Sequence, residues 1–177
     1  AEQYLDDTGH AAWANYTIIN LASRKGSDQI GLIGGDSTNG DANAWIWDGT
    51  TFGSFTEITA AARLPNPSRE ELAIAWESNS GHLVAVAVAS TPADSIVSKE
   101  YTTSWSAATA AFQCAVTGGA IRWLSLKPNP VGDDMVIATE STSGPDVNTC
   151  YWTGSAWANF NTHDSAVDFS SMRVVDF

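Results

Sequence analysis

A repeat of about 52 residues is the sequence feature that most limits how this chain can fold. One landmark is an aromatic residue that closes a polar turn, and it recurs at steps of 53 and 52 residues as Phe52, Trp105 and Trp157. A second landmark is an arginine that precedes an apolar run, and it recurs at steps of 53 and 51 residues as Arg69, Arg122 and Arg173. Repeats of this length indicate units that bury their apolar faces against one another in a stacked or radial array.

Each unit is predicted to contain four short strands. Side chains alternate between the two faces of a strand, so Leu72, Ile74 and Trp76 are expected to share one face. In "LVAVAVA" (83–89) the valines are likewise expected to face opposite the alanines. No long stretch has helical periodicity, and Asn, Asp, Gly and Ser cluster where the strands should reverse, as in "WDG" at 47–49. The pattern predicts strands joined by tight turns.

The predicted fold is therefore all-β, a β-propeller-like array of about 3.4 four-stranded repeats in a single domain, 1–177. The approximate units are 16–62, 63–119 and 120–172, with a split partial unit formed by 173–177 and 1–15. Propellers usually close with roughly 4–8 blades, so the two ends are expected to complete each other by strand pairing, within one molecule or between molecules. The residues predicted to make this assembly contact are Trp13, Tyr16, Arg173, Val174, Val175 and Phe177.

The charge balance excludes two classes of partner. The chain carries 20 acidic and 8 basic residues, a formal net charge of −12. A basic groove for nucleic acid is not expected from so few cations, and the same acidity disfavours anionic membrane surfaces. No apolar run approaches the roughly 20 residues that span a bilayer, so membrane insertion is not expected either.

Several features favour an extracellular or cell-surface protein. The chain is rich in tryptophan and poor in lysine, and a small residue at position 1 fits the product of signal-peptide cleavage. Cys114 and Cys150 are predicted either to form a disulfide or to remain two buried thiols. Asn15 begins an Asn-Tyr-Thr glycosylation sequon.

Catalytic groups are sparse. The three histidines, His10, His82 and His163, lie in turn-like or terminal segments and are predicted to be solvated. "GDS" at 35–37 is similar to the nucleophile block of the GDSL esterases, but the companion aspartate is missing, because Phe160 stands three residues before His163. We therefore expect no enzymatic activity and no cofactor.

Calcium is the one metal that the sequence offers a place for. The loop "GGDSTNGDAN" supplies closely spaced oxygens in a glycine-bearing segment, which suits a hard cation. These residues are Asp36, Asn39, Asp41 and Asn43. An ordinary tight turn is the competing interpretation, because Asp, Asn and Gly also favour turns. Asp133 and Asp134 are interpreted as two solvated charges in a hairpin turn.

The phrase "LAIAWESNSGHLVAVA" after Arg69, followed by turns such as "WDGTTF", resembles tandem repeats of about 50 residues in large secreted or cell-surface proteins of bacteria and archaea. This resemblance implies extracellular, non-enzymatic, propeller-like modules with no catalytic residues to transfer. The chain departs from the pattern in two ways: its second unit has lost the turn glycine ("YTTSW"), and it holds only a few units.

Two functions from different classes follow. The first is a structural protein, the subunit of a filament, sheath or surface layer that assembles through its own ends. The alternative is a glycan-binding, lectin-like module or adhesin, in which Trp and Tyr form platforms in the grooves between blades. The paired aromatics that flank each turn are expected to belong to the scaffold in the first case and to stack on sugars in the second.

Overall fold

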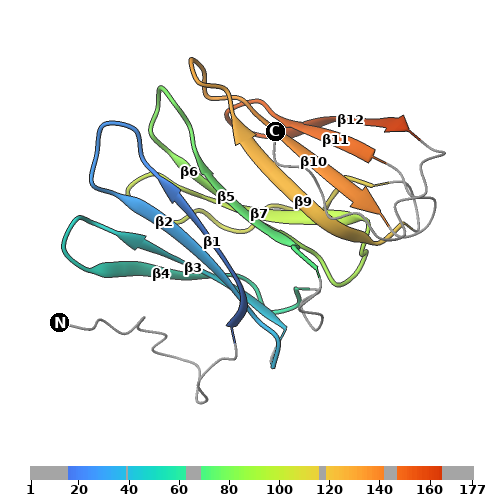
Figure 1. The fold of residues 1–177 in the computed structure, drawn as a ribbon, viewed down its shortest axis with the longest axis horizontal. Coiled ribbons are helices and arrows are strands. Elements are labelled where there is room, and N and C mark those ends of the chain that lie inside the picture. Colours follow the sequence, from blue (N-terminus) through green and yellow to red (C-terminus); the bar gives the residue numbers. More distant parts are fainter. Residues whose placement is uncertain (1–15, 39, 63–68, 116–118, 142–146, 165–177) are drawn as a thin grey trace.

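A computed structural model describes residues 16–38, 40–62, 69–115, 119–141 and 147–164 as three four-stranded antiparallel sheets (Figure 1). The first sheet contains β1 (Tyr16–Ser23), β2 (Ile30–Asp36), β3 (Asp41–Trp47) and β4 (Phe52–Thr59). The second contains β5 (Leu72–Trp76), β6 (Leu83–Val88), β7 (Ser95–Tyr101) and β8 (Phe112–Gln113). The third contains β9 (Ile121–Pro128), β10 (Met135–Ser141), β11 (Val147–Trp152) and β12 (Trp157–Asp164). In these residues there is no helix, and hence none long and apolar enough to cross a membrane.

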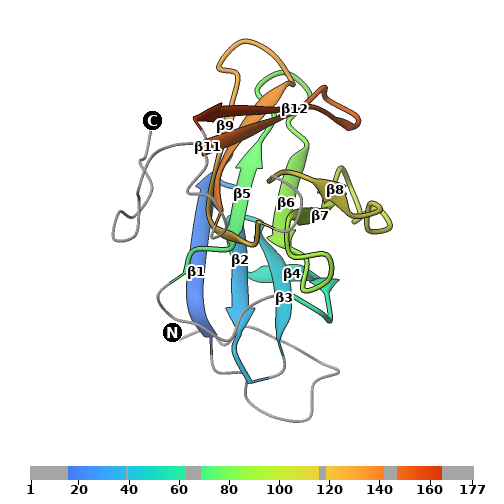
Figure 2. The same cartoon turned by 90° about the vertical axis from the view of Figure 1, so that its right-hand side faces the viewer.

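The sheets are arranged like propeller blades, with their first strands together at the inner edge. In each sheet the strands follow the order of the sequence, and the first strands β1, β5 and β9 lie next to one another (Figure 2). Two backbone hydrogen bonds join Glu70, just before β5, to β9: the Glu70 amide donates to the Arg122 carbonyl at 3.1 Å, and the Leu124 amide donates to the Glu70 carbonyl at 3.0 Å. The all-β, propeller-like fold predicted from the repeat is confirmed.

Strand registers show which positions of the three sheets are equivalent. The second strands begin with Ile30, Leu83 and Met135. Each pairs with the aromatic residue that ends the third strand of its sheet, respectively Trp47, Tyr101 and Trp152. Positions counted from these pairs can therefore be compared directly between sheets.

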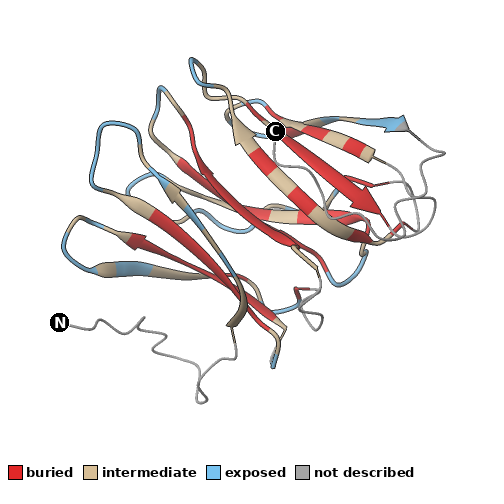
Figure 3. Cartoon of the chain, viewed as in Figure 1, coloured by how far each residue is buried: buried red, intermediate tan, exposed pale blue. Residues whose placement is uncertain are grey.

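The apolar core lies between the sheets in two layers, and the middle strands carry most of it (Figure 3). One layer joins the first and second sheets and includes Leu72, Ile74 and Trp76, the three residues predicted to share a face. The other joins the second and third sheets and includes the valines of β6, whereas Ala85 and Ala87 face the first layer. The predicted alternation in β6 is confirmed. Gly31 allows close approach of the sheets, because a Cβ there would lie 2.7 Å from Leu83 Cδ2.

A disulfide crosses the second core layer. Cys114, just after β8, and Cys150 in β11 have their Sγ atoms 2.02 Å apart and their Cα atoms 5.8 Å apart. Both cysteines are buried, so the bond ties the outer strand of the second sheet to the third sheet. A bond of this kind stabilises mainly by restricting the unfolded chain.

The turn that lacks glycine in the second sheet has a structural reason. Four residues separate the flanking aromatics in the first and third sheets, and Gly49 and Gly154 adopt φ of 104° and 87° there. Only three residues separate Tyr101 from Trp105, and none of these three has a positive φ. The shorter turn does not need the left-handed conformation that favours glycine.

The first sheet has four strands of its own, with Tyr16 at the start of β1. The Tyr16 ring packs edge-on against Trp45, with centroids 5.7 Å apart. The other residues predicted to complete a split unit, together with the sequon asparagine, lie outside the described residues: Trp13, Asn15, Arg173, Val174, Val175 and Phe177. Assembly through these ends stays a prediction.

Candidate functional site

The turn between the first and second strands has the same construction in all three sheets. The amide of its first residue donates to the carbonyl of its last residue, at 2.9, 2.7 and 2.8 Å in the three sheets. These first and last residues are Arg24 and Gln29, Glu77 and His82, and Asn129 and Asp134. In each case the two side chains also contact each other, at 2.5, 3.6 and 2.9 Å respectively. Each sheet thus presents a polar pair at the same end of its strands.

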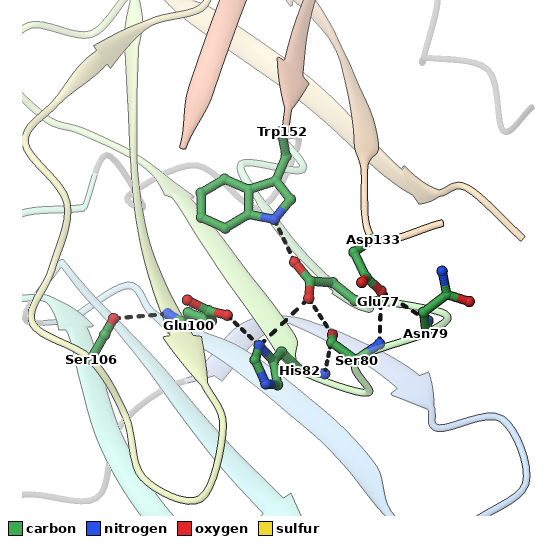
Figure 4. Close-up of polar contacts among 8 residues, drawn as sticks. All are labelled: Glu77, Asn79, Ser80, His82, Glu100, Ser106, Asp133 and Trp152. Atoms are coloured by element: carbon green, nitrogen blue, oxygen red, sulfur yellow. Dashed lines mark hydrogen bonds and ion pairs between the residues drawn. The ribbon is translucent and has the colours of Figure 1, made fainter. Parts of the chain in front are cut away.

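The junction of the second and third sheets has the richest chemistry (Figure 4). His82 Nδ1 lies 2.6 Å from Glu100 Oε1 and 3.6 Å from Glu77 Oε2. The side chain of His82 is 37% exposed and that of Glu100 is 25% exposed, whereas Glu77 is only 1% exposed. One buried and one accessible carboxylate therefore face a single imidazole nitrogen.

The buried carboxylate is fixed by the neighbouring sheet. Trp152 Nε1 at the end of β11 donates to Glu77 Oε1 at 2.6 Å, and the Ser80 hydroxyl donates to Glu77 Oε2. A buried carboxylate is stable only when hydrogen bonds replace its water. Trp152 therefore orients Glu77 and closes the junction from the side of the third sheet (Figure 4).

A second contact across this junction links the two turns. Asp133 Oδ1 accepts hydrogen bonds from the amides of Asn79 and Ser80, both at 2.8 Å. Ser78 Oγ donates to the Asn129 carbonyl at 2.6 Å in the same contact. The amide of Ser80, followed by that of Asn79, lowers the pKa of Asp133 below its ordinary value.

We expect this link to give the chain an acid-sensitive contribution to stability. Because the pKa of Asp133 is lower when folded than when unfolded, its stabilising effect is present above the unfolded value and is lost as pH falls through the folded one. The free energy of unfolding of an Asp133→Ala variant should be lower than that of the parent at pH 7, and the difference should shrink in acid. Urea titrations of both proteins at neutral and acidic pH test this; a difference that grows in acid contradicts it.

The same junction is the one place in the described ranges where three His, Cys, Asp or Glu side chains bring ligand atoms within 4.8 Å of one another. Glu77, His82 and Glu100 offer two oxygens and one nitrogen, a donor set that suits a divalent cation such as zinc. Each of these side chains already has a hydrogen-bond or ion-pair partner within the protein. The arrangement is thus complete as a polar cluster without an ion.

Paired aromatics flank the turn between the third and fourth strands of every sheet. Ring centroids lie 5.2 Å apart in the first two pairs and 5.3 Å apart in the third, at interplanar angles of 57° to 58°. The pairs are Trp47 with Phe52, Tyr101 with Trp105, and Trp152 with Trp157. This common geometry confirms that the aromatics recur as a structural unit of the repeat.

The second and third pairs are anchored on the preceding sheet. Trp105 Nε1 donates to the Ser54 carbonyl of β4, and Trp157 Nε1 donates to Ser98 Oγ of β7 at 2.9 Å. Trp152 is 2% exposed and Trp157 is 9% exposed, so the third pair belongs to the scaffold. The pairs of the first and second sheets are half-buried and keep part of their surface accessible.

Two adjoining cavities follow the inner strands. One, of about 370 Å³, lies among β1, β5 and β9 and includes Leu21, Glu70 and Trp123 in its lining. The other, of about 300 Å³, is lined by Trp76, Lys25, Lys127 and neighbouring residues. Trp76 Nε1 donates to the Ala22 carbonyl at 2.9 Å, and the Arg24 guanidinium lies 5.3 Å from the centre of its ring.

The predicted calcium loop is a tight reversal between β2 and β3. Asp36 and Asp41 are cross-strand partners, and Asp36 Oδ1 accepts a hydrogen bond from the Thr38 amide at 2.8 Å, as in an ordinary Asx turn. Asp36, Asp41 and Asn43 are buried, and Asn39 lies outside the described residues. Calcium binding stays a prediction.

Sequence reasoning missed the partners of two groups. His82 was predicted to be a solvated surface histidine; its side chain is 37% exposed, and it also pairs with Glu100. Asp133 was predicted to be a solvated charge in a hairpin turn; it lies in the turn between β9 and β10 and also accepts hydrogen bonds from two amides of the neighbouring sheet. His163 contacts Thr149 Oγ1 at 2.7 Å through Nε2, and His10 lies outside the described residues.

The fold and its junctions define a β-propeller-like protein, and comparison with known proteins agrees. No family model and no curated protein matches the chain. The crystal structure of AofleA from Arthrobotrys oligospora matches with a TM-score of 0.57 at 12% identity, over 84% of this chain and 43% of that one. The fungal lectin of Aleuria aurantia, a six-bladed β-propeller with a novel fucose recognition mode, matches with a TM-score of 0.50 at 12% identity, over 83% of this chain and 48% of that one.

The chain thus spans less than half of the length of either structure. At this identity the likeness shows the fold alone. The propeller-like part of the predicted resemblance is confirmed, and its bacterial or archaeal origin stays a prediction.

Proposed function

We propose that this chain is a glycan-binding module with a lectin-like propeller fold, and that it holds its ligand at the junctions between consecutive sheets. The observation that carries the proposal is the accessible pair of His82 and Glu100, only 2.6 Å apart, at the junction closed by Trp152. Sugar hydroxyls both donate and accept hydrogen bonds. A carboxylate accepts them, and an imidazole can do either.

The surroundings of the pair support this proposal. Small-molecule sites depend on a small number of precisely placed polar groups that fix the orientation of the ligand. Here the hydrogen bond between Trp152 and Glu77 fixes the buried side of the junction, while the side chains of His82 and Glu100 remain partly exposed to solvent. The turn of the first sheet presents a different polar pair at the equivalent place, so the junction of the first and second sheets would select different sugars.

The filament or sheath subunit predicted first has less support. The solved structures that share the fold include a fucose-recognising lectin, which favours the glycan-binding alternative. We further propose a non-enzymatic, extracellular or cell-surface protein. The Cys114–Cys150 disulfide supports an oxidising compartment.

A glycan array followed by calorimetry on its hits tests the proposal. The parent chain should bind a limited set of glycans, fucosylated ones among them. Glu100→Gln should weaken the affinity for a ligand at this junction by roughly 10-fold or more, because a hydrogen bond to a charged acceptor is lost. Asp28→Asn is the control, since it removes an exposed carboxylate from the turn between β1 and β2 of the first sheet, outside the junction of the second and third sheets. A parent that binds no glycan, or a loss that is equal in both variants, contradicts the proposal.

A further inference from the structure

The first strand of each sheet carries two apolar residues whose burial differs between sheets. Both residues lie on the face that points away from the following sheet. Their cross-strand partners lie two and four residues after the first residue of the second strand. In the second sheet these are Ile74 and Leu72, which are 5% and 0% exposed and pack against the first sheet. In the third sheet they are Leu126 and Leu124, 7% and 4% exposed.

The same two positions of the first sheet are open. They are Leu21 and Ile19, and each is 58% exposed. The first sheet forms one end of the array, and no described sheet precedes it (Figure 1). Apolar residues that are buried in two equivalent places and exposed in the third indicate a face that is built to be covered.

The opposite end of the array has a matching hollow. A cavity of about 270 Å³ on the third sheet is lined by Val136, Thr149, Cys150, Tyr151, Asn159 and Asn161. By register, Val136 and Thr149 correspond to Val84 and Ser98 of the second sheet. Ser98 is the residue that receives the Trp157 indole of the next sheet, at 2.9 Å. The hollow therefore lies where a following sheet would place its aromatic pair.

In the first sheet, the aromatic pair equivalent to Trp152 and Trp157 is Trp47 with Phe52. It has the same geometry as the anchored pairs, and both rings are half-buried. The described residues thus contain two complete inter-sheet contacts and the two unmatched halves of a third. A contact between two different surfaces of the same protein is head-to-tail. It produces a closed ring when the rotation that relates successive copies adds up to a full turn.

We propose that the open face of the first sheet, Ile19, Leu21, Trp47 and Phe52, binds the hollow of the third sheet around Thr149 in a second copy of this chain, so that two copies close a ring of six sheets. The number of sheets fits the six-bladed fold of the Aleuria aurantia lectin, of which this chain covers 48%. Each copy would supply one open face and one hollow, giving two identical new contacts.

Sedimentation velocity of the 177-residue chain at micromolar concentration tests the proposal. We expect a particle of roughly 37 kDa, twice 18.7 kDa. Leu21→Asp and, separately, Thr149→Arg should each raise the dimer dissociation constant on the order of 100-fold, because each places a charge in a contact that excludes water. Val131→Asp is the matched control, since Val131 is an apolar residue that is 79% exposed on the turn between β9 and β10. It should leave the dimer intact.

Three outcomes overturn the proposal. A parent that stays monomeric means that the face is covered within the chain. A dimer that resists Thr149→Arg but not Leu21→Asp means that two first sheets meet each other. Assemblies larger than a dimer mean that the head-to-tail contact does not close after two copies. Circular dichroism of each variant confirms that the sheets remain folded. None of these outcomes bears on glycan binding at the junction of the second and third sheets, which lies within one chain.

Discussion

Replacing Trp152 with alanine is expected to destabilise the chain by roughly 3–5 kcal/mol, the usual range when a buried tryptophan is truncated. The indole is 2% exposed and packs in the core layer between the second and third sheets. Its removal also leaves Glu77, a buried carboxylate, without the hydrogen bond from Nε1. The loss therefore combines a cavity with a buried carboxylate oxygen, Glu77 Oε1, that has lost its hydrogen-bond donor.

Denaturant unfolding monitored by circular dichroism measures this effect, and Trp152→Phe separates its two parts. Phenylalanine keeps most of the ring volume but has no N–H group, so we expect it to lose about 1–3 kcal/mol. Adding Glu77→Gln to Trp152→Phe should recover part of that loss, because a neutral amide costs less to bury than a carboxylate that has lost one of its donors. A loss below about 1 kcal/mol for Trp152→Ala contradicts the packing described for this junction.

Removing the disulfide is expected to have an effect of similar size. Cys114 and Cys150 are 36 residues apart, and restricting a loop of that length in the unfolded chain is worth roughly 4 kcal/mol in the chain-entropy model. The double variant Cys114→Ala with Cys150→Ala should therefore unfold at a much lower denaturant concentration than the oxidised parent.

Two controls make this result specific. The reduced parent keeps both side chains, so it separates loss of the cross-link from loss of packing in the core. The double variant should gain nothing from oxidation and lose nothing on reduction. Identical unfolding midpoints for the oxidised and reduced parent would mean that the cross-link does not contribute to stability.

The repeat made much of the fold predictable. The period of about 52 residues and the alternation in β5 and β6 predicted sheets of four strands and the faces of Ile74 and Val86. Both signals are local or periodic, and they depend only on which side chains can share a face. The exposure of Ile19 and Leu21 was not predicted, because the repeat pattern marks equivalent positions but does not show how far each of them is covered.

The candidate site was mostly missed, since its contacts join residues far apart in the sequence, either on different strands of the second sheet or on neighbouring sheets. His82 and Glu100 are 18 residues apart, and Asn79 and Asp133 are 54 residues apart. The second separation is close to one repeat, and this was a usable signal. Equivalent turns of consecutive units lie side by side, so an aspartate in one turn can accept hydrogen bonds from the amides of the turn before it. Composition alone made these groups look like solvated turn residues.

The central claim is that glycans bind at the junction of the second and third sheets. The most direct test is a nuclear magnetic resonance titration of the chain with a glycan identified on the array, following the His82 imidazole and the Trp152 indole. We predict saturable shifts at both groups, and their absence in Glu100→Gln at the same glycan concentration. Shifts confined to the inner cavities around Trp76 or Trp123, with His82 and Trp152 unchanged, would contradict the account.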